Sequence, residues 1–246
     1  MDAYFIFGGF FMQKKLKSLY GYFSKGERIL WCVSVLLIVT SFIIFDRENY
    51  LVLTASLVGV TSLIFDAKGN PAGQVLMVLF SLLYGAISYT FAYYGEMFTY
   101  LGMTAPMSVF ALVSWIKNPH NGNKSEVEIA SINGRETVFM AMMAAVVTYV
   151  FYYILAYFNT ANLIPSTISV TTSFIAVYLT YKRSAFFAVA YATNDIILII
   201  LWTLAAISDI SYLSVVTCFV LFLTNDTYTF INWKRMYKRQ RAGEAV

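Results

Sequence analysis

Eight apolar stretches, most of them close to the length that crosses a bilayer, dominate this chain of 246 residues. A helix that rises 1.5 Å per residue needs about 20 residues to cross roughly 30 Å of hydrocarbon. The stretches cover residues 29–45, 50–65, 74–93, 99–116, 137–158, 165–181, 185–207 and 211–233. Only 12% of the residues are charged, against about 25% in soluble domains. The sequence therefore predicts an all-α integral membrane protein with eight transmembrane helices.

The distribution of basic residues predicts the orientation of these helices. Sixteen of the 17 Lys and Arg residues flank the ends that share one side of an eight-helix bundle, and Arg47 alone lies on the other side. Cytoplasmic loops carry the excess of positive charge, so we expect a multi-pass protein of the bacterial plasma (inner) membrane with both termini in the cytoplasm. The same spread of charge along loops and tails argues against nucleic acid as a partner and makes the lipid bilayer the expected one.

One long polar connection, residues 117–136, divides the chain into two halves with similar turn and end residues. Residues 50–116 and 165–233 then form two parallel three-helix repeats, and residues 137–158 form the helix that links them. Residues 29–45 form an extra helix in front of the first repeat. We expect residues 1–28 to be an interfacial segment, because their lysines follow the apolar run instead of preceding it as in a signal peptide, and residues 234–246 to be a basic cytoplasmic tail.

Two copies of the tripeptide Thr-Asn-Asp lie deep in the last two apolar stretches. They contain Asn194 and Asp195 in the first copy and Asn225 and Asp226 in the second. An ionisable group in hydrocarbon costs several kcal/mol and by default marks a binding site or a pathway. Because helices joined by a short turn pack together, we expect the two triplets to face one another near the middle of the membrane. The alternative is that these side chains only hydrogen-bond neighbouring helices to each other.

Further polar and aromatic residues extend this set of candidates. Tyr191 and Tyr228 each lie three residues from an asparagine and share its helix face. Gln74 lies at the start of the third stretch, where it is either a site residue or an interface group. The four tryptophans, Trp31, Trp115, Trp202 and Trp233, fall at stretch ends, where aromatic belts occur; Trp202 is alternatively a gate or a lid over a ligand.

The sequence contains no catalytic or metal-binding signature. Its single histidine, His120, lies in the polar connection, and Cys32 and Cys218 are isolated within apolar stretches. Nucleophile-elbow, zinc-protease and phosphate-loop motifs are missing from the sequence. We therefore expect no catalytic residues, no cofactor and no metal, and a transporter instead of an enzyme.

Two regions resemble the PnuC family of bacterial vitamin transporters. The first is Tyr-Gly-Glu-Met at residues 94–97, with Met-Thr-Ala-Pro-Met at 103–107 and Trp-Ile-Lys-Asn-Pro at 115–119. The second runs from Phe-Leu-Thr-Asn-Asp at residues 222–226 through Tyr228 to Asn-Trp-Lys-Arg-Met at 232–236. The resemblance extends over roughly residues 51–236.

This resemblance implies a SWEET-like fold and uptake of nicotinamide riboside by facilitated diffusion, with metabolic trapping in the cytoplasm. Asn194, Asn225 and Tyr228 best match the family's substrate site. The sequence departs from the family at Thr229, where a glycine is usual, and at Phe187, Ala190 and Tyr191, where a tryptophan is often found. Thiamine, riboflavin and (deoxy)nucleosides stay open as substrates, as do proton or sodium coupling, a homo-oligomer, and a non-transporting scaffold or sensor that uses the basic tail.

Overall fold

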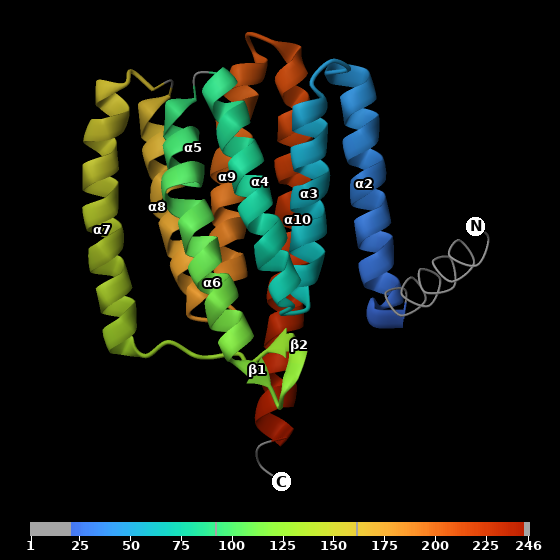
Figure 1. Ribbon diagram of the computed structural model, residues 1–246. Coiled ribbons are helices and arrows are strands. Elements are labelled where there is room, and N and C mark those ends of the chain that lie inside the picture. The colour runs from blue at the N-terminus through green and yellow to red at the C-terminus, as the bar shows by residue number, and fades with distance from the viewer. Residues whose placement is uncertain (1–20, 92, 161, 244–246) are drawn as a thin grey trace, which may run out of the picture.

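The computed structural model describes residues 21–91, 93–160 and 162–243. Within these ranges, eight helical segments are long and apolar enough to cross a membrane, which confirms the expected fold class. Figure 1 shows them as one bundle. The elements are α2 (Lys25–Phe45), α3 (Tyr50–Ala67), α4 (Pro71–Thr90), α5 (Tyr94–Thr99), the π-helical turn η1 (Tyr100–Thr104), α6 (Ala105–Lys117), β1 (Pro119–His120), β2 (Asn123–Val127), α7 (Gly134–Tyr157), α8 (Leu163–Tyr181), α9 (Phe187–Ala206), the 3₁₀ turn η2 (Ile210–Tyr212) and α10 (Leu213–Gly243).

Capping residues explain where several helices begin. Ser24 and Glu27 form a reciprocal capping box, so α2 begins at Lys25, four residues before the apolar stretch that predicted it. Asn49, Asn70 and Asn133 accept hydrogen bonds from the first turns of α3, α4 and α7. Residues 1–20 of the expected interfacial segment lie outside the described residues.

The segment Tyr94–Lys117 crosses the bundle as one broken helix, α5–η1–α6. Pro106, in the first turn of α6, has no N–H to donate to the preceding turn, and the π-helical turn Tyr100–Thr104 lies directly before it. All three parts of this segment contact both α4 and α8.

Six of the membrane segments form a closed ring. Each segment contacts the next in the order α3, α4, α6, α8, α9 and α10, and α10 contacts α3 to complete the ring. The helix α7 packs on α8, and α2 packs on α3 and α10, outside the ring. A site inside the ring is therefore enclosed by both halves of the chain.

The turns at one end of the bundle carry Lys68, Lys182 and Arg183, and we call it the basic end. The chain enters α2 and leaves α10 at this end, the lower one in Figure 1. The end with Arg47 and Asp209 is called the opposite end. The turns after α3 and α8 have the same form, since Gly69 (φ +64°) and Arg183 (φ +58°) both adopt left-handed conformations two residues beyond the helix.

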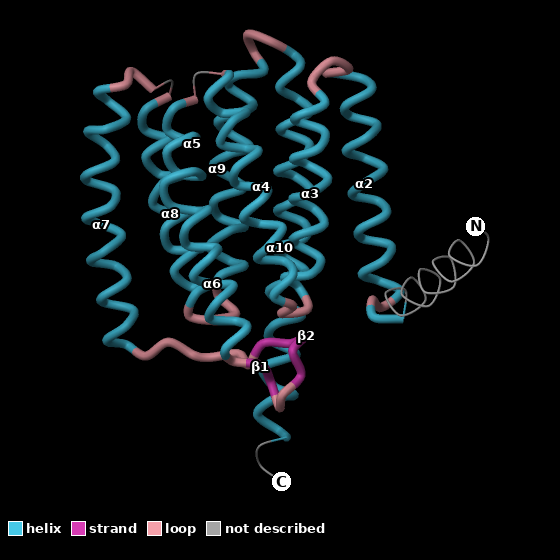
Figure 2. The backbone as a smooth tube through the Cα atoms, in the orientation of Figure 1, coloured by secondary structure: helices cyan, strands magenta, loops and turns pink. Residues whose placement is uncertain are grey.

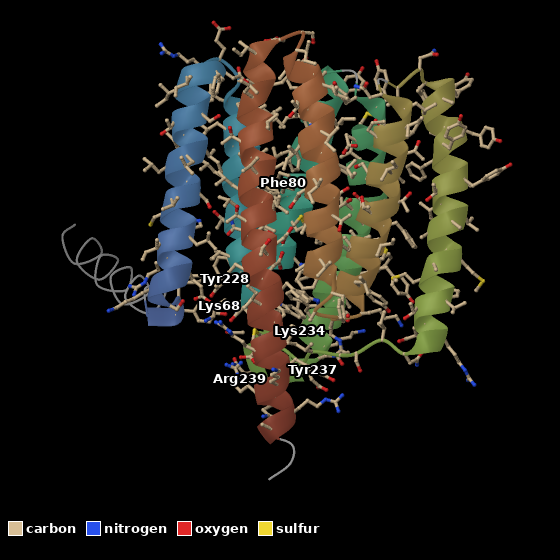
Figure 3. The ribbon with its side chains drawn as sticks, turned by 180° about the vertical axis from the view of Figure 1, so that it is seen from behind. Lys68, Phe80, Tyr228, Lys234, Tyr237 and Arg239 are labelled. Atoms are coloured by element: carbon tan, nitrogen blue, oxygen red, sulfur yellow. The ribbon has the colours of Figure 1, made fainter. Side chains whose placement is uncertain are left out.

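A small β-hairpin covers the basic end, as Figure 2 shows. The strands β1 and β2 pair antiparallel within the connection predicted as residues 117–136. Gln240 of α10 donates to Val127 O (3.0 Å) and accepts from Ile129 N (2.9 Å). Arg239, labelled in Figure 3 on the lower part of α10, pairs with Glu126. These contacts explain why α10 continues to Gly243, so most of the expected tail is helix.

Two apolar clusters fill the ring, one toward each end. The cluster toward the opposite end contains Phe80, Tyr84, Trp202 and Phe219. The cluster toward the basic end contains Trp115, Phe187 and Trp233. Trp115, Trp202 and Trp233 are fully buried, so the prediction that they belong to lipid-facing belts was wrong. Trp31 keeps an exposed ring, and its indole N–H donates to Thr61.

Candidate functional site

The two intramembrane aspartates meet between α9 and α10. Asp195 and Asp226 are both buried, and their carboxyl groups lie within hydrogen-bonding reach of each other. Asp195 Oδ2 and Asp226 Oδ1 are buried without a hydrogen-bond partner among the described residues. Two carboxyl groups in contact in an apolar environment cannot both be ionised. The unpartnered oxygens of the pair can accept hydrogen bonds or contact a cation.

Asp66, a third buried carboxyl group, lies at the basic end of α3. It accepts hydrogen bonds from Gln74 Nε2 (2.8 Å) and Ser62 Oγ (3.4 Å). A Cβ atom on Gly73 would come within 2.2 Å of Asp66 Oδ1, so only glycine allows α4 to approach this carboxyl group. Gln74 is thereby fixed beside Asp66.

Tyr191 lies near all three of these carboxyl groups. It lies on α9, one turn before Asp195, and its hydroxyl interacts with Thr180 of α8. Asp66, Asp195 and Asp226 all lie close enough to Tyr191 to interact with it electrostatically. The side chain is half-buried, and its ring meets the ring of Phe187 edge to face at 6.2 Å. Tyr191 therefore presents an aromatic surface and a hydroxyl among three carboxyl groups.

The two asparagines point away from each other. Asn194 Oδ1 accepts from Ser169 (3.2 Å), Thr172 (2.8 Å) and Ser173 (3.1 Å) of α8. Asn225 Nδ2 donates to Ser34 of α2 (3.2 Å) and to Leu221 O (2.8 Å). The aspartates of the Thr-Asn-Asp triplets thus face one another, whereas the asparagines connect to helices on either side. The buried Asn225 Oδ1 has no partner among the described residues.

Tyr228 and Trp202 lie toward the two ends of the bundle. The Tyr228 hydroxyl donates to Glu27 of α2 (3.1 Å), near the basic end, where Figure 3 labels it close to Lys68. Trp202 Nε1 donates to the Tyr84 hydroxyl (2.6 Å). The Trp202 ring lies among Tyr93 (4.8 Å), Tyr212 (5.6 Å) and Phe91 (5.9 Å). These aromatic side chains close the ring toward the opposite end.

Two buried acids were missed in the sequence. Asp66 falls one residue beyond the predicted stretch 50–65, and Glu96 falls between the predicted stretches 74–93 and 99–116. In the structure both are buried, and Ser169, which donates to Asn194, also lies beside Glu96. The available signal was the spacing of Glu96, Thr99 and Met103, which places the three side chains on one helix face. This spacing indicates that the helix predicted to begin at residue 99 already includes Glu96.

The buried charged side chains of the described residues are all acidic. The buried charged residues in the described part of the chain are Glu27, Asp66, Glu96, Asp195 and Asp226. No lysine, arginine or histidine among these described residues is buried. Among the described residues, the interior therefore offers carboxyl groups but no buried cation that could pair with a phosphate.

Comparisons with known proteins agree with this architecture. The family model described as "Nicotinamide mononucleotide transporter" matches residues 49–235. The chain is 25% identical over 227 residues to the nicotinamide riboside transporter PnuC of Neisseria mucosa (strain ATCC 25996 / DSM 4631 / NCTC 10774 / M26), covering 91% of this chain and 86% of that protein. It is similar to the crystal structure of the vitamin B3 transporter PnuC, with a TM-score of 0.77 and 22% identity over 89% of this chain and 94% of that chain. Because the family model spans most of the chain, and the described residues contain eight helical segments long and apolar enough to cross a membrane, this multi-pass membrane protein belongs to the PnuC family, whose model is described as nicotinamide mononucleotide transporter.

Proposed function

We propose that this protein carries nicotinamide riboside across the plasma membrane by facilitated diffusion, followed by trapping of the substrate in the cytoplasm. The observation that carries the proposal is that the helices of the ring bury Asp66, Glu96, Asp195 and Asp226, while no Lys, Arg or His is buried among the described residues. Nicotinamide riboside bears one positive charge on its pyridinium ring. The mononucleotide adds a phosphate with about two negative charges, which this interior would repel.

The carboxyl pair Asp195–Asp226 is the proposed receptor for the pyridinium ring, and Tyr191 offers its ring face to the same cation. Gln74 lies beside Asp66 and is a candidate for the substrate amide. Two asparagines are candidates for binding the ribose hydroxyls. The hydroxyl groups of α8 orient Asn194, and the buried Oδ1 of Asn225 has no hydrogen-bond donor among the described residues.

In the proposed mechanism, packed aromatic side chains limit access to this site at both ends of the bundle. Trp202 and its aromatic neighbours close the opposite end, and we assign Trp202 to gating. At the basic end the rings of Trp115 and Trp233 lie 5.4 Å apart. Tyr228 ties α10 to Glu27 of α2, so we assign it a role in holding the lower part of α10. Alternate opening of the two ends would move substrate in either direction without ATP, as facilitated diffusion requires.

The tryptophan contacts also support two parallel repeats, α3–α6 and α8–α10, linked by α7. Trp115, at the end of the first repeat, donates to Thr180 O at the end of α8 (3.0 Å). Trp233, at the end of the second repeat, donates to Asp66 O at the end of α3 (2.7 Å). The two bonds are reciprocal, as expected if a two-fold pseudosymmetry axis runs along the membrane normal. By the positive-inside rule, the basic end is the proposed cytoplasmic end.

Uptake into proteoliposomes tests the proposal. Purified full-length protein should admit labelled nicotinamide riboside in a saturable manner, without ATP and without accumulation above the external concentration. An unlabelled excess of nicotinamide riboside should compete, and thiamine, riboflavin and deoxynucleosides should compete less well. Accumulation against a gradient would indicate proton or sodium coupling instead, and absence of flux for every compound would favour a scaffold or sensor.

A further inference from the structure

A groove on the outside of the bundle lies between α2 and α3 at the basic end. Its volume is about 840 Å³, within the roughly 300–1,000 Å³ typical of small-molecule sites. It is lined by Phe23, Lys25, Glu27, Arg28, Ile29, Trp31, Cys32, Thr61, Ile64 and Phe65. None of these residues belongs to the ring interior that holds the carboxyl pair.

The mouth of the groove is positively charged. Lys25 is exposed and Arg28 half-buried, and both lie in the first turn of α2. Arg28 Nε–H donates to Ser24 O (3.4 Å). The carboxylate of Glu27, between the two cations in sequence, pairs with Lys68 (3.6 Å) and accepts from Ser24 N (2.7 Å) and from the Tyr228 hydroxyl (3.1 Å). An anion at the mouth therefore meets two cations and a carboxylate whose charge is shared with Lys68.

The rest of the groove is apolar. Ile29, Ile64 and Phe65 form its walls, and the ring of Phe65 packs edge to face on Phe23 at 5.2 Å. Trp31 lies deeper, fixed by its hydrogen bond to Thr61 (3.1 Å). From Lys25 to Cys32 the helix rises about 10 Å at 1.5 Å per residue. The groove thus leads from the height of the lipid headgroups into the acyl-chain region.

We propose that this groove binds one anionic phospholipid from the leaflet at the basic end. Lys25 and Arg28 contact the phosphate, and an acyl chain lies along Ile29, Ile64 and Phe65. A basic pocket between membrane helices is a recurring site for acidic lipids, and a tryptophan near the interface stabilises the glycerol region. The lipid would hold α2 against the ring at the point where Glu27 already contacts α10.

Cys32 provides a reporter within the groove. It is free and exposed, whereas Cys218 is free and buried. Full-length protein in a neutral detergent is treated with N-ethylmaleimide while phosphatidylglycerol or phosphatidylcholine of identical chains is titrated, and the modified peptide is followed by mass spectrometry. Phosphatidylglycerol should protect Cys32 at concentrations at which phosphatidylcholine does not.

Charge variants complete the test. The double variant Lys25→Gln/Arg28→Gln should need about 30-fold more phosphatidylglycerol for the same protection, because each cation near the membrane surface changes lipid affinity about fivefold. The control Lys124→Gln/Arg135→Gln removes the same charge from exposed positions at the same end and should leave protection unchanged. Equal protection by phosphatidylcholine, protection by glycerol phosphate alone, an equal loss in the control, or a Cys32 that is unreactive without any lipid would each overturn the proposal.

Discussion

Replacing the carboxyl pair tests whether one shared negative charge binds the substrate. In the proposed site the contacting carboxyl groups of Asp195 and Asp226 share one proton and one negative charge, so each single substitution, Asp195→Asn or Asp226→Asn, leaves one carboxylate that can ionise beside an amide of nearly the same shape. Each single variant therefore keeps the charge, and we expect its affinity for nicotinamide riboside to change less than tenfold.

The double variant Asp195→Asn/Asp226→Asn removes the charge. For a pyridinium ring about 5 Å away and an effective dielectric constant of about 20, the lost attraction is about 3 kcal/mol. That loss weakens binding by on the order of 10²-fold. The loss is strongly non-additive, because neither single variant shows it.

The assay is equilibrium binding of nicotinamide riboside to the purified variants, with thermal unfolding as the control for folding. Uncharged nicotinamide should bind the double variant and the parent protein about equally, since it has no charge to lose. Two single variants that each lose as much as the double variant, or a double variant with full affinity, would refute the shared-charge account.

Three further sets of substitutions test the packing around the site. Trp202→Phe and Tyr84→Phe each remove the same 2.6 Å hydrogen bond. Tyr84→Phe should lower stability by about 1 kcal/mol, and Trp202→Phe by more, because the smaller ring also leaves a cavity at a fully buried position. The double variant should lose less than the sum, whereas additive losses would show that the two side chains act independently. Gly73→Ala places a Cβ atom 2.2 Å from Asp66 Oδ1 and should lower the free energy of unfolding by roughly 1–3 kcal/mol, measured as a lower unfolding temperature. Gly102→Ala is the matched control, because no atom outside the local backbone lies within 4 Å of a Cβ there. Equal unfolding temperatures of the two variants would contradict the close approach of α4 to Asp66. Trp115→Phe and Trp233→Phe each leave one helix-end carbonyl without its indole donor and should slow transport to a similar extent, measured in proteoliposomes; an effect confined to one of them would argue against the proposed repeat.

The helices were predictable from the sequence because an apolar stretch in a bilayer has few alternatives to a helix. Their ends were less predictable, because they depend on local and tertiary contacts. Ser24 and Glu27 start α2 before its apolar stretch, and the hairpin contacts of Gln240 carry α10 through residues that looked like a tail.

The candidate site was predictable only in part. Adjacent antiparallel helices brought Asp195 and Asp226 together as expected. The asparagine next to each aspartate is about 100° around the helix, so it had to face another neighbour, and α8 and α2 supply the partners. Asp66 and Glu96 were missed because both lie at helix ends, where a shift of one turn in the predicted boundary moves a carboxyl group from water into the bundle.

Side-by-side equilibrium binding of nicotinamide riboside and nicotinamide mononucleotide to the purified full-length protein tests the central claim most directly. An acidic interior without a buried base predicts that the riboside binds and that the mononucleotide binds at least about 100-fold more weakly, because its phosphate meets carboxyl groups and no cation. Equal or tighter binding of the mononucleotide would contradict the account.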